Sequence, residues 1–345
     1  MSNGSDELKG KLGVGIDIGT MNFVCARHDG TQVNTTLVRD AFLDLEVESK
    51  KTLKLSQVDF LELGDQLVVL GESALQMANL FKREVRRPLS RGLLAPGELK
   101  SQEVLAWLLY SILGEAKEVG EHCYYSVPAE PIDLPDHDIG FHTEVFRRII
   151  EEHKYTAHPM NEAMAIVYSQ CEDSGFSGLA MSFGAGLCNV ALSLQAMMGM
   201  SFSIARGGGD WIDNHSAKAV GSTASRMCAL KERGEFKLSD PPKDNSEAEA
   251  IALYVRTLIH NCLEDIAKKI RKEQSGADLM SPIPLVVSGG TTLANGFMDV
   301  FREEFEKVKS KGFPVRISEI RQAKDPLKSV AEGLLVLANH EYEAD

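Results

Sequence analysis

The sequence reads Gly15-Ile-Asp-Ile-Gly-Thr20 near its start and Leu285-Val-Val-Ser-Gly-Gly-Thr-Thr292 near its end. Each stretch is an apolar, β-branched run that stops at a turn of small residues. This is typical of a buried strand that brings its backbone up to a phosphate or a purine base. A third segment, Leu179 to Leu192, repeats the pattern midway with the turn Ser182-Phe-Gly-Ala-Gly186. Three such turns predict one nucleotide held between two similar halves.

The composition fits two domains or one two-lobed body. Of the 345 residues, 43% are hydrophobic, which is enough for more than one core. The formal net charge of −13 argues against nucleic acid as a general partner, because nucleic-acid binding needs a basic face. The six cysteines are scattered, with no Cys-x-x-Cys pair and no histidine at ligand spacing from them. Neither zinc nor a disulfide framework is therefore expected.

The first residues contain neither the basic stretch nor the apolar stretch of a secretory signal. The longest apolar runs fall short of the ~20 residues that cross a bilayer. We therefore expect a cytoplasmic protein with reduced thiols, and membrane contact is not predicted.

Strand, hairpin and helix patterns occur in the same order in both halves of the chain. In the first half, a strand at 12–18 returns as a hairpin before amphipathic helices. In the second half, strands begin at Leu179 and a long helix covers 246–273. The pattern predicts an α/β fold of two duplicated domains, residues 1–160 and 161–345, with the ligand cleft between the copies.

The first turn offers Asp17 and the residues Gly19, Thr20, Met21 and Asn22 to a ligand. Backbone N–H groups and hydroxyl or amide side chains at such a turn can surround an anion. Asp17, at the strand end, is placed to order the water shell of Mg²⁺, an ion that keeps most of its waters. The alternative is a plain β-hairpin with a structural aspartate.

The third turn contains Gly289, Gly290 and Thr291, where a flat base could lie against the backbone because glycine has no Cβ. The alternative is a tight strand-to-helix turn without a ligand. In order and spacing, however, the three turns resemble those of the actin superfamily, which includes actin, bacterial actins, the seventy-kilodalton heat-shock chaperones and sugar kinases. The resemblance covers nearly the whole chain and is strongest to MreB-type and MamK-type bacterial actins.

The resemblance implies two ribonuclease-H-like domains that hold ATP or ADP, with Mg²⁺, in the cleft between them. It also implies small subdomains at about 30–95 and 211–275. A C-terminal helix would return to the first lobe.

Glu162 lies in Asn161-Glu-Ala-Met-Ala165, which resembles the first connecting helix of bacterial actins. The resemblance gives Glu162 the catalytic role of orienting the attacking water, which a carboxylate on a rigid helix can do. The alternative is a glutamate favoured by the positive end of the helix dipole. The resemblance assigns further nucleotide contacts to Gly184, Ala185, Gly186, Gly208, Gly209, Asp210, Lys231 and Glu232.

Ser182 departs from the family pattern, in which the second phosphate loop begins with an aspartate. The glycines of Gly184-Ala-Gly186 are kept, so the backbone can still cradle a phosphate. Removing one carboxylate from a metal site weakens both metal binding and transition-state stabilisation. We therefore expect nucleotide binding with slow ATP hydrolysis.

Two functions are compatible with the resemblance. The first is a cytoskeletal protein that polymerises with itself, head to tail, into filaments when ATP binds. The second is a non-polymerising nucleotide-binding adaptor, similar to the pilus-assembly or division-site actin homologues. An adaptor or cargo protein would be a further partner. A small-molecule kinase is disfavoured, because no general-base aspartate lies near the second phosphate loop.

Overall fold

The structure is a computed structural model that describes residues 12–81, 83–95, 101–134, 138–273 and 281–343. The chain divides into two compact units. The first comprises Met1–Val127, Asp138–Met160 and Leu334–Asp345, and the second comprises Pro128–His137 and Asn161–Gly333.

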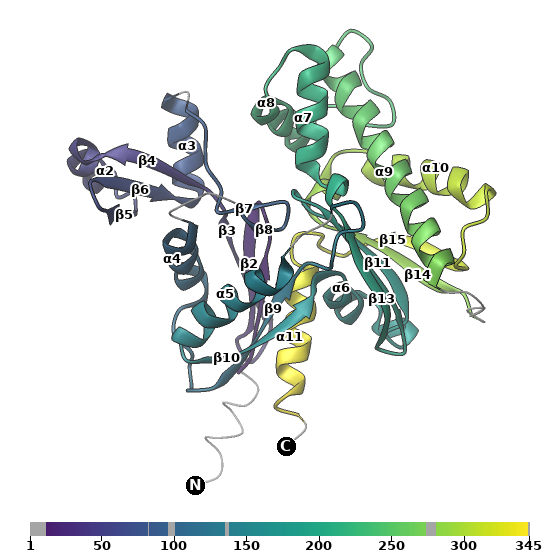
Figure 1. The fold of residues 1–345 in the computed structure, drawn as a ribbon, viewed down its shortest axis with the longest axis horizontal. Helices are drawn as coiled ribbons and strands as arrows, with labels where there is room; N and C mark the ends of the chain where they lie inside the picture. The colour runs from purple at the N-terminus through teal and green to yellow at the C-terminus, as the bar shows by residue number, and fades with distance from the viewer. Residues whose placement is uncertain (1–11, 82, 96–100, 135–137, 274–280, 344–345) are drawn as a thin grey trace. The chain divides into compact units, whose positions relative to one another are not determined.

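A five-stranded sheet and two helices form the main body of the first unit (Figure 1). Its elements are β1 (Val14–Ile18), β2 (Asn22–His28), β3 (Val33–Arg39), α4 (Ser101–Leu113), β9 (Glu121–Val127), α5 (Ile139–Glu152) and β10 (Tyr155–Asn161). The strand order is β10-β9-β1-β2-β3. Ile16 of β1 packs with Leu108 of α4 and Phe146 of α5 in one buried cluster, so the helices cover the sheet with their apolar faces.

A smaller sheet with its own core lies between β3 and α4 in the chain. Its elements are β4 (Phe42–Glu46), η1 (Val47–Ser49), α2 (Lys50–Leu55), β5 (Phe60–Leu63), β6 (Gln66–Leu70) and α3 (Gly71–Phe81), followed by the short pair β7 (Leu89–Ser90) and β8 (Leu93–Leu94). The strand order is β4-β6-β5. Leu43, Leu53 and Leu67 belong to a cluster separate from the main core of the unit.

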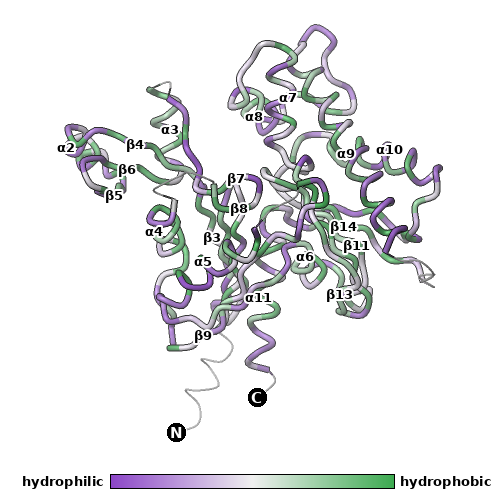
Figure 2. Tube along the Cα trace, in the orientation of Figure 1, coloured by the Kyte–Doolittle hydropathy of each residue, from purple (hydrophilic) through white to green (hydrophobic). Residues whose placement is uncertain are grey.

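The second unit has a five-stranded sheet in the order β13-β12-β11-β14-β15. Its elements are α6 (Glu162–Gln170), η2 (Glu172–Ser174), β11 (Gly178–Phe183), β12 (Cys188–Leu194), β13 (Met197–Ile204), η3 (Ala205–Gly207), α7 (Gly209–Val220), α8 (Ala224–Arg233), α9 (Ser246–Glu273), β14 (Ile283–Ser288), η4 (Gly290–Leu293), α10 (Phe297–Ser310) and β15 (Ile317–Gln322). The central strands β11 and β14 are buried throughout, and Figure 2 colours them as largely hydrophobic. A last helix, α11 (Ser329–His340), ends in the first unit. No helix of the described residues is both long and apolar enough to cross a bilayer.

The two five-stranded sheets repeat one plan. In each, three consecutive strands pair antiparallel, β1-β2-β3 in one and β11-β12-β13 in the other. The first strand of each trio then pairs in parallel with a later strand, β9 or β14. The prediction of duplicated α/β domains is therefore confirmed.

Strand β10 is an element that the sequence analysis did not predict. It is an edge strand and contains Pro159, which has no N–H for a sheet ladder and interrupts the apolar alternation. The following helix begins at Glu162. Asn161 caps it, because its side-chain oxygen accepts hydrogen bonds from the N–H groups of Ala163 and Met164.

Candidate functional site

The first predicted turn joins β1 to β2 in the first unit. The Gly19 N–H donates to the Asn22 carbonyl oxygen at 3.1 Å and closes a tight hairpin. The Gly92 N–H donates to the Thr20 hydroxyl oxygen at 2.9 Å. Among the described residues, the backbone N–H groups of Thr20 and Met21 have no acceptor. The turn therefore presents two consecutive donors.

Asp17 precedes this turn by two residues. Its Oδ1 accepts a hydrogen bond from the hydroxyl of Ser126, on β9, at 2.8 Å. Burial raises the pKa of Asp17 to about 6, and the Ser126 hydrogen bond acts in the opposite direction. Burial thus disfavours the charged carboxylate, and a cation bound beside it would favour the ionised form again.

Asp40 is a buried carboxyl group beside the same turn that the sequence analysis missed. Its N–H donates to the Met21 carbonyl oxygen at 2.9 Å, and its Oδ2 accepts from the Leu89 N–H at 3.3 Å. Burial raises the pKa of Asp40 well above its usual range, while the charge of Arg87 lowers it. The pair Arg39-Asp40 looks like an exposed charged turn in the sequence, so its burial had no sequence signal.

The second predicted turn joins β11 to β12 in the second unit and has the same closure. The Gly184 N–H donates to the Leu187 carbonyl oxygen at 3.0 Å. The N–H groups of Ala185 and Gly186 have no acceptor in the part of the chain that the structure describes. Both hairpin turns thus leave a pair of consecutive donors.

The Gly208–Asp210 segment packs directly on the second turn. The Gly209 N–H donates to the Gly184 carbonyl oxygen, and the Asp210 N–H donates to that of Ala185, both at 2.9 Å. A Cβ on Gly208 would lie 2.4 Å from the Ala185 carbonyl oxygen and 2.5 Å from the Gly186 carbonyl carbon. Glycine is required at 208 because two backbone segments touch there.

The third predicted turn closes on the same loop. The Thr291 hydroxyl donates to the Gly184 carbonyl oxygen at 2.9 Å. Gly289 has a φ of +94°, and a Cβ there would lie 2.4 Å from the carbonyl oxygen of Phe183. Gly290 follows as the first residue of η4. The second unit therefore brings together three segments that are far apart in the sequence.

Glu162 is held by two side chains of the β11–β12 hairpin. Its Oε1 accepts from the Ser182 hydroxyl and its Oε2 from the Asn189 amide, both at 2.6 Å. Asn189 also accepts a hydrogen bond from the Ala129 N–H at 3.0 Å. The Ser182 hydroxyl thus orients the candidate catalytic carboxylate. Ser182 and Asn189 are register partners across the hairpin, which the sequence analysis did not use.

Comparison with known protein families finds one family that matches nearly the whole chain. A family model described as Volactin matches residues 12–338. The chain belongs to the Volactin family. Among curated proteins, none matches the sequence.

Solved actin-superfamily structures match this Volactin-family chain over nearly its whole length. A MamK double helical filament is 18% identical with a TM-score of 0.72, covering 94% of this chain and 98% of that one. MreB5 of Spiroplasma citri is 14% identical with a TM-score of 0.67, covering 97% and 98%. The ethanolamine utilization protein EutJ from Carboxydothermus hydrogenoformans is 15% identical with a TM-score of 0.55, covering 94% and 89%. The actin-like fold predicted from the three turns is confirmed.

Lys231 of the Volactin-family chain is buried beneath the Gly208–Asp210 segment. Its Nζ lies 2.7 Å from Oδ1 of Asp213 and donates to the Gly209 carbonyl oxygen at 3.3 Å. Burial raises the pKa of Asp213, and the charge and hydrogen bond of Lys231 lower it. Its neighbour Glu232 is exposed, so the two residues of the predicted Lys-Glu pair have different environments.

We expect Lys231→Met to lower the free energy of unfolding by about 3 kcal/mol, because it leaves the Asp213 carboxylate buried without its partner. Lys231 lowers the pKa of Asp213, so removing Lys231 raises this folded-state pKa further above the unfolded value, and the variant loses more stability than the parent as pH rises. The deficit should therefore be smaller at pH 5 than at pH 8 in urea unfolding. Lys231→Met combined with Asp213→Leu should recover part of the loss. A deficit equal at both pH values would contradict the buried-pair explanation.

The duplicated fold places Ser182 in the position that Asp17 has in the first unit. Asp17 lies two residues before Gly19, and Ser182 lies two residues before Gly184. The N–H of each glycine closes its hairpin. One half of the protein therefore has a carboxylate at this position. The other half has an uncharged hydroxyl that is bonded to Glu162.

Proposed function

We propose that the protein binds ATP or ADP with Mg²⁺ and assembles with copies of itself, head to tail, into cytoskeletal filaments. Nucleotide binding is supported above all by the two hairpin turns, whose paired N–H groups at Thr20 and Met21 and at Ala185 and Gly186 have no acceptor in the described chain. Backbone N–H groups in folded proteins are normally paired. Successive free N–H groups form a concavity that suits phosphate oxygens.

The remaining site residues keep the roles that the family resemblance implies. Asp17 would hold the hydrated Mg²⁺, which fits a carboxyl group two residues before the first turn. When bound, Mg²⁺ would neutralise phosphate charge. Glu162 would accept a hydrogen bond from the attacking water. The proposed contacts to the phosphates, ribose and base are Gly19, Thr20, Met21, Asn22, Gly184, Ala185, Gly186, Gly208, Gly209, Asp210, Lys231, Glu232, Gly289, Gly290 and Thr291.

Hydrolysis is proposed to be slow. Ser182 supplies no charge for the metal or the water, and its hydroxyl is engaged by Glu162. A single carboxylate, Asp17, would be left to attract the ion.

We place the filaments in the cytoplasm. Their assembly is supported by the fold of MamK, and nucleotide binding is supported by the fold of MreB5. MamK was solved as a double helical filament, and MreB5 of Spiroplasma citri was solved bound to ADP. Head-to-tail contacts that do not close into a ring produce open filaments. An adaptor or cargo protein would bind the polymer.

The test is sedimentation and light scattering of the purified protein with and without ATP–Mg²⁺, with phosphate release measured in parallel. We expect nucleotide-dependent pelleting and phosphate release that lags behind assembly. ADP–Mg²⁺ and ATP with a chelator are the matched controls. A protein that binds ATP but stays in the supernatant at high concentration would rule out the filament.

The second candidate function is a non-polymerising nucleotide-binding adaptor. It is favoured by Ser182, because an adaptor does not need fast hydrolysis to turn over a polymer. The same experiment separates the two, since only the filament predicts pelleting that depends on nucleotide.

A further inference from the structure

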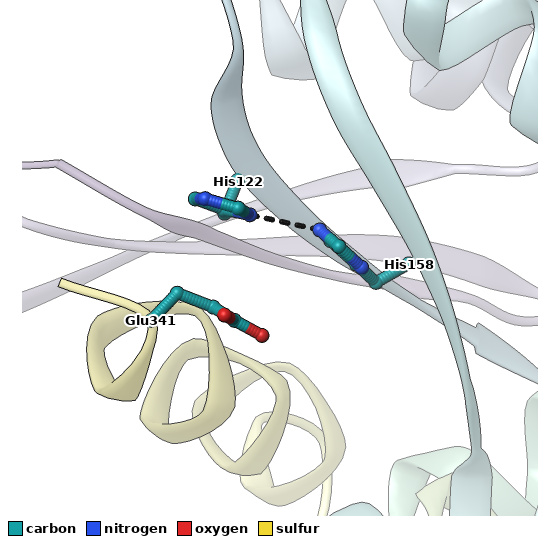
Figure 3. Close-up of side chains that lie close together, drawn as sticks. All are labelled: His122, His158 and Glu341. Carbon is teal, nitrogen blue, oxygen red and sulfur yellow. Dashed lines mark hydrogen bonds between the residues drawn. The ribbon is translucent and has the colours of Figure 1, made fainter. Parts of the chain in front are cut away.

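Three metal-ligating side chains meet at one edge of the sheet in the first unit. His122 comes from β9, His158 comes from the neighbouring edge strand β10, and Glu341 directly follows α11 (Figure 3). Nδ1 of His122 and Nε2 of His158 lie 2.8 Å apart. One ligand atom from each of the three residues lies within 4.8 Å of the others. All three side chains are half-buried, so an ion could reach them.

Neighbouring side chains hold these groups in place. The Tyr124 hydroxyl donates to Oε1 of Glu341 at 2.6 Å, which fixes the carboxylate. The ring of His158 stacks between those of His122 and Tyr124, with centroid distances of 5.0 and 4.7 Å. The ring of Tyr342 contacts His122 edge-on at 5.3 Å. Metal sites use such surrounding contacts to orient their ligands.

We propose that His122, His158 and Glu341 form a binding site for a divalent cation of the zinc class. Two imidazole nitrogens and one carboxylate are a ligand set that zinc uses when a fourth position is left open to water. Zinc–nitrogen bonds of about 2.0–2.1 Å at a tetrahedral angle place the two nitrogens about 3.4 Å apart. The rings therefore need to separate by only about 0.6 Å from their hydrogen-bonded distance.

The cysteine pattern of the sequence gives no indication of this site. No zinc was expected from the sequence because its cysteines form no pair. The proposed site contains no cysteine, so that expectation does not apply to it. His122 and His158 are also too far apart in the sequence for a short spacing motif.

The site is separate from the proposed nucleotide turns. His122 lies near the start of β9, while Ser126, which bonds Asp17, lies near its end. Four residues of strand separate them by about 13 Å. A cation at His122 would instead fasten the residues after α11 to the sheet edge of the first unit.

The test uses the full chain, freed of metal by chelation and without nucleotide, titrated with Zn²⁺ by calorimetry and with Co²⁺ by visible absorption. We expect one Zn²⁺ per chain, a visible Co²⁺ band and a higher melting temperature with Zn²⁺. His158→Ala and Glu341→Gln should each weaken Zn²⁺ binding by about tenfold or more. Glu341→Gln can still accept the Tyr124 hydrogen bond, so it is expected to fold.

The matched control is His340→Ala, which removes an exposed histidine one residue before Glu341 and should bind Zn²⁺ like the parent protein. Circular-dichroism melting of the metal-free variants shows whether each is folded. Failure of the parent chain to bind stoichiometric Zn²⁺ would overturn the proposal. Folded His158→Ala and Glu341→Gln variants that bind as tightly as the parent would overturn it too.

Discussion

Gly208→Ala is expected to abolish nucleotide binding and to lower the free energy of unfolding by about 3 kcal/mol. The new Cβ would lie within 2.6 Å of backbone atoms of Ala185, Gly186 and Leu187. Backbone cannot swing aside as a flexible side chain can, so relief requires the second turn to open. Opening it would displace the free N–H groups that we propose for a phosphate. Urea unfolding and titration with a fluorescent ADP analogue measure the two effects.

Gly199→Ala is the matched control in the same unit. A Cβ there would meet its nearest neighbour, the Leu192 carbonyl oxygen, at 3.5 Å, which is an ordinary contact. Its stability should stay within about 0.5 kcal/mol of the parent, and nucleotide binding should be unchanged. If folded Gly208→Ala bound nucleotide as Gly199→Ala does, the second turn could not be part of the nucleotide site.

The sequence predicted the elements whose residues follow one strong period. The helix expected at 246–273 has the same bounds in α9, because its apolar residues recur at helical spacing. The turn at Gly289 was recognisable because close backbone approach and a positive φ demand glycine there, and this requirement is visible in the sequence.

Contacts that depend on how elements pack were not predictable in the same way. Lys231 and Glu232 are adjacent and similar in polarity, yet one is buried in an ion pair and the other is exposed, because α8 presents opposite faces to the core and to water. The pairing of His122 with His158 requires the edge strand β10, which the sequence analysis did not predict. Asp40 is fully buried, and its carboxyl group accepts a hydrogen bond from Leu89, a residue far from it in the sequence.

Glu162→Gln is expected to slow phosphate release by about 100-fold while ATP affinity stays within twofold of the parent, on the proposal that Glu162 orients the attacking water. The substitution suits the local hydrogen bonds. The amide oxygen can accept from Asn189, and the amide nitrogen can donate to the Ser182 hydroxyl, which is able to reverse its role. The variant should therefore fold normally and lose only the charged acceptor. Single-turnover phosphate release and equilibrium nucleotide titration measure the two quantities separately.

Two further variants distinguish a catalytic role from a structural one. Glu172→Gln changes an exposed glutamate of the same unit and should leave both quantities unaltered. Ser182→Ala removes one of the two donors to Glu162 and should slow phosphate release less than Glu162→Gln does, because Asn189 still holds the carboxylate. Equal losses of ATP affinity and phosphate release in Glu162→Gln would mean that Glu162 supports the β11–β12 hairpin instead. If phosphate release were slower in Ser182→Ala than in Glu162→Gln, the Ser182 hydroxyl itself would contact the attacking water.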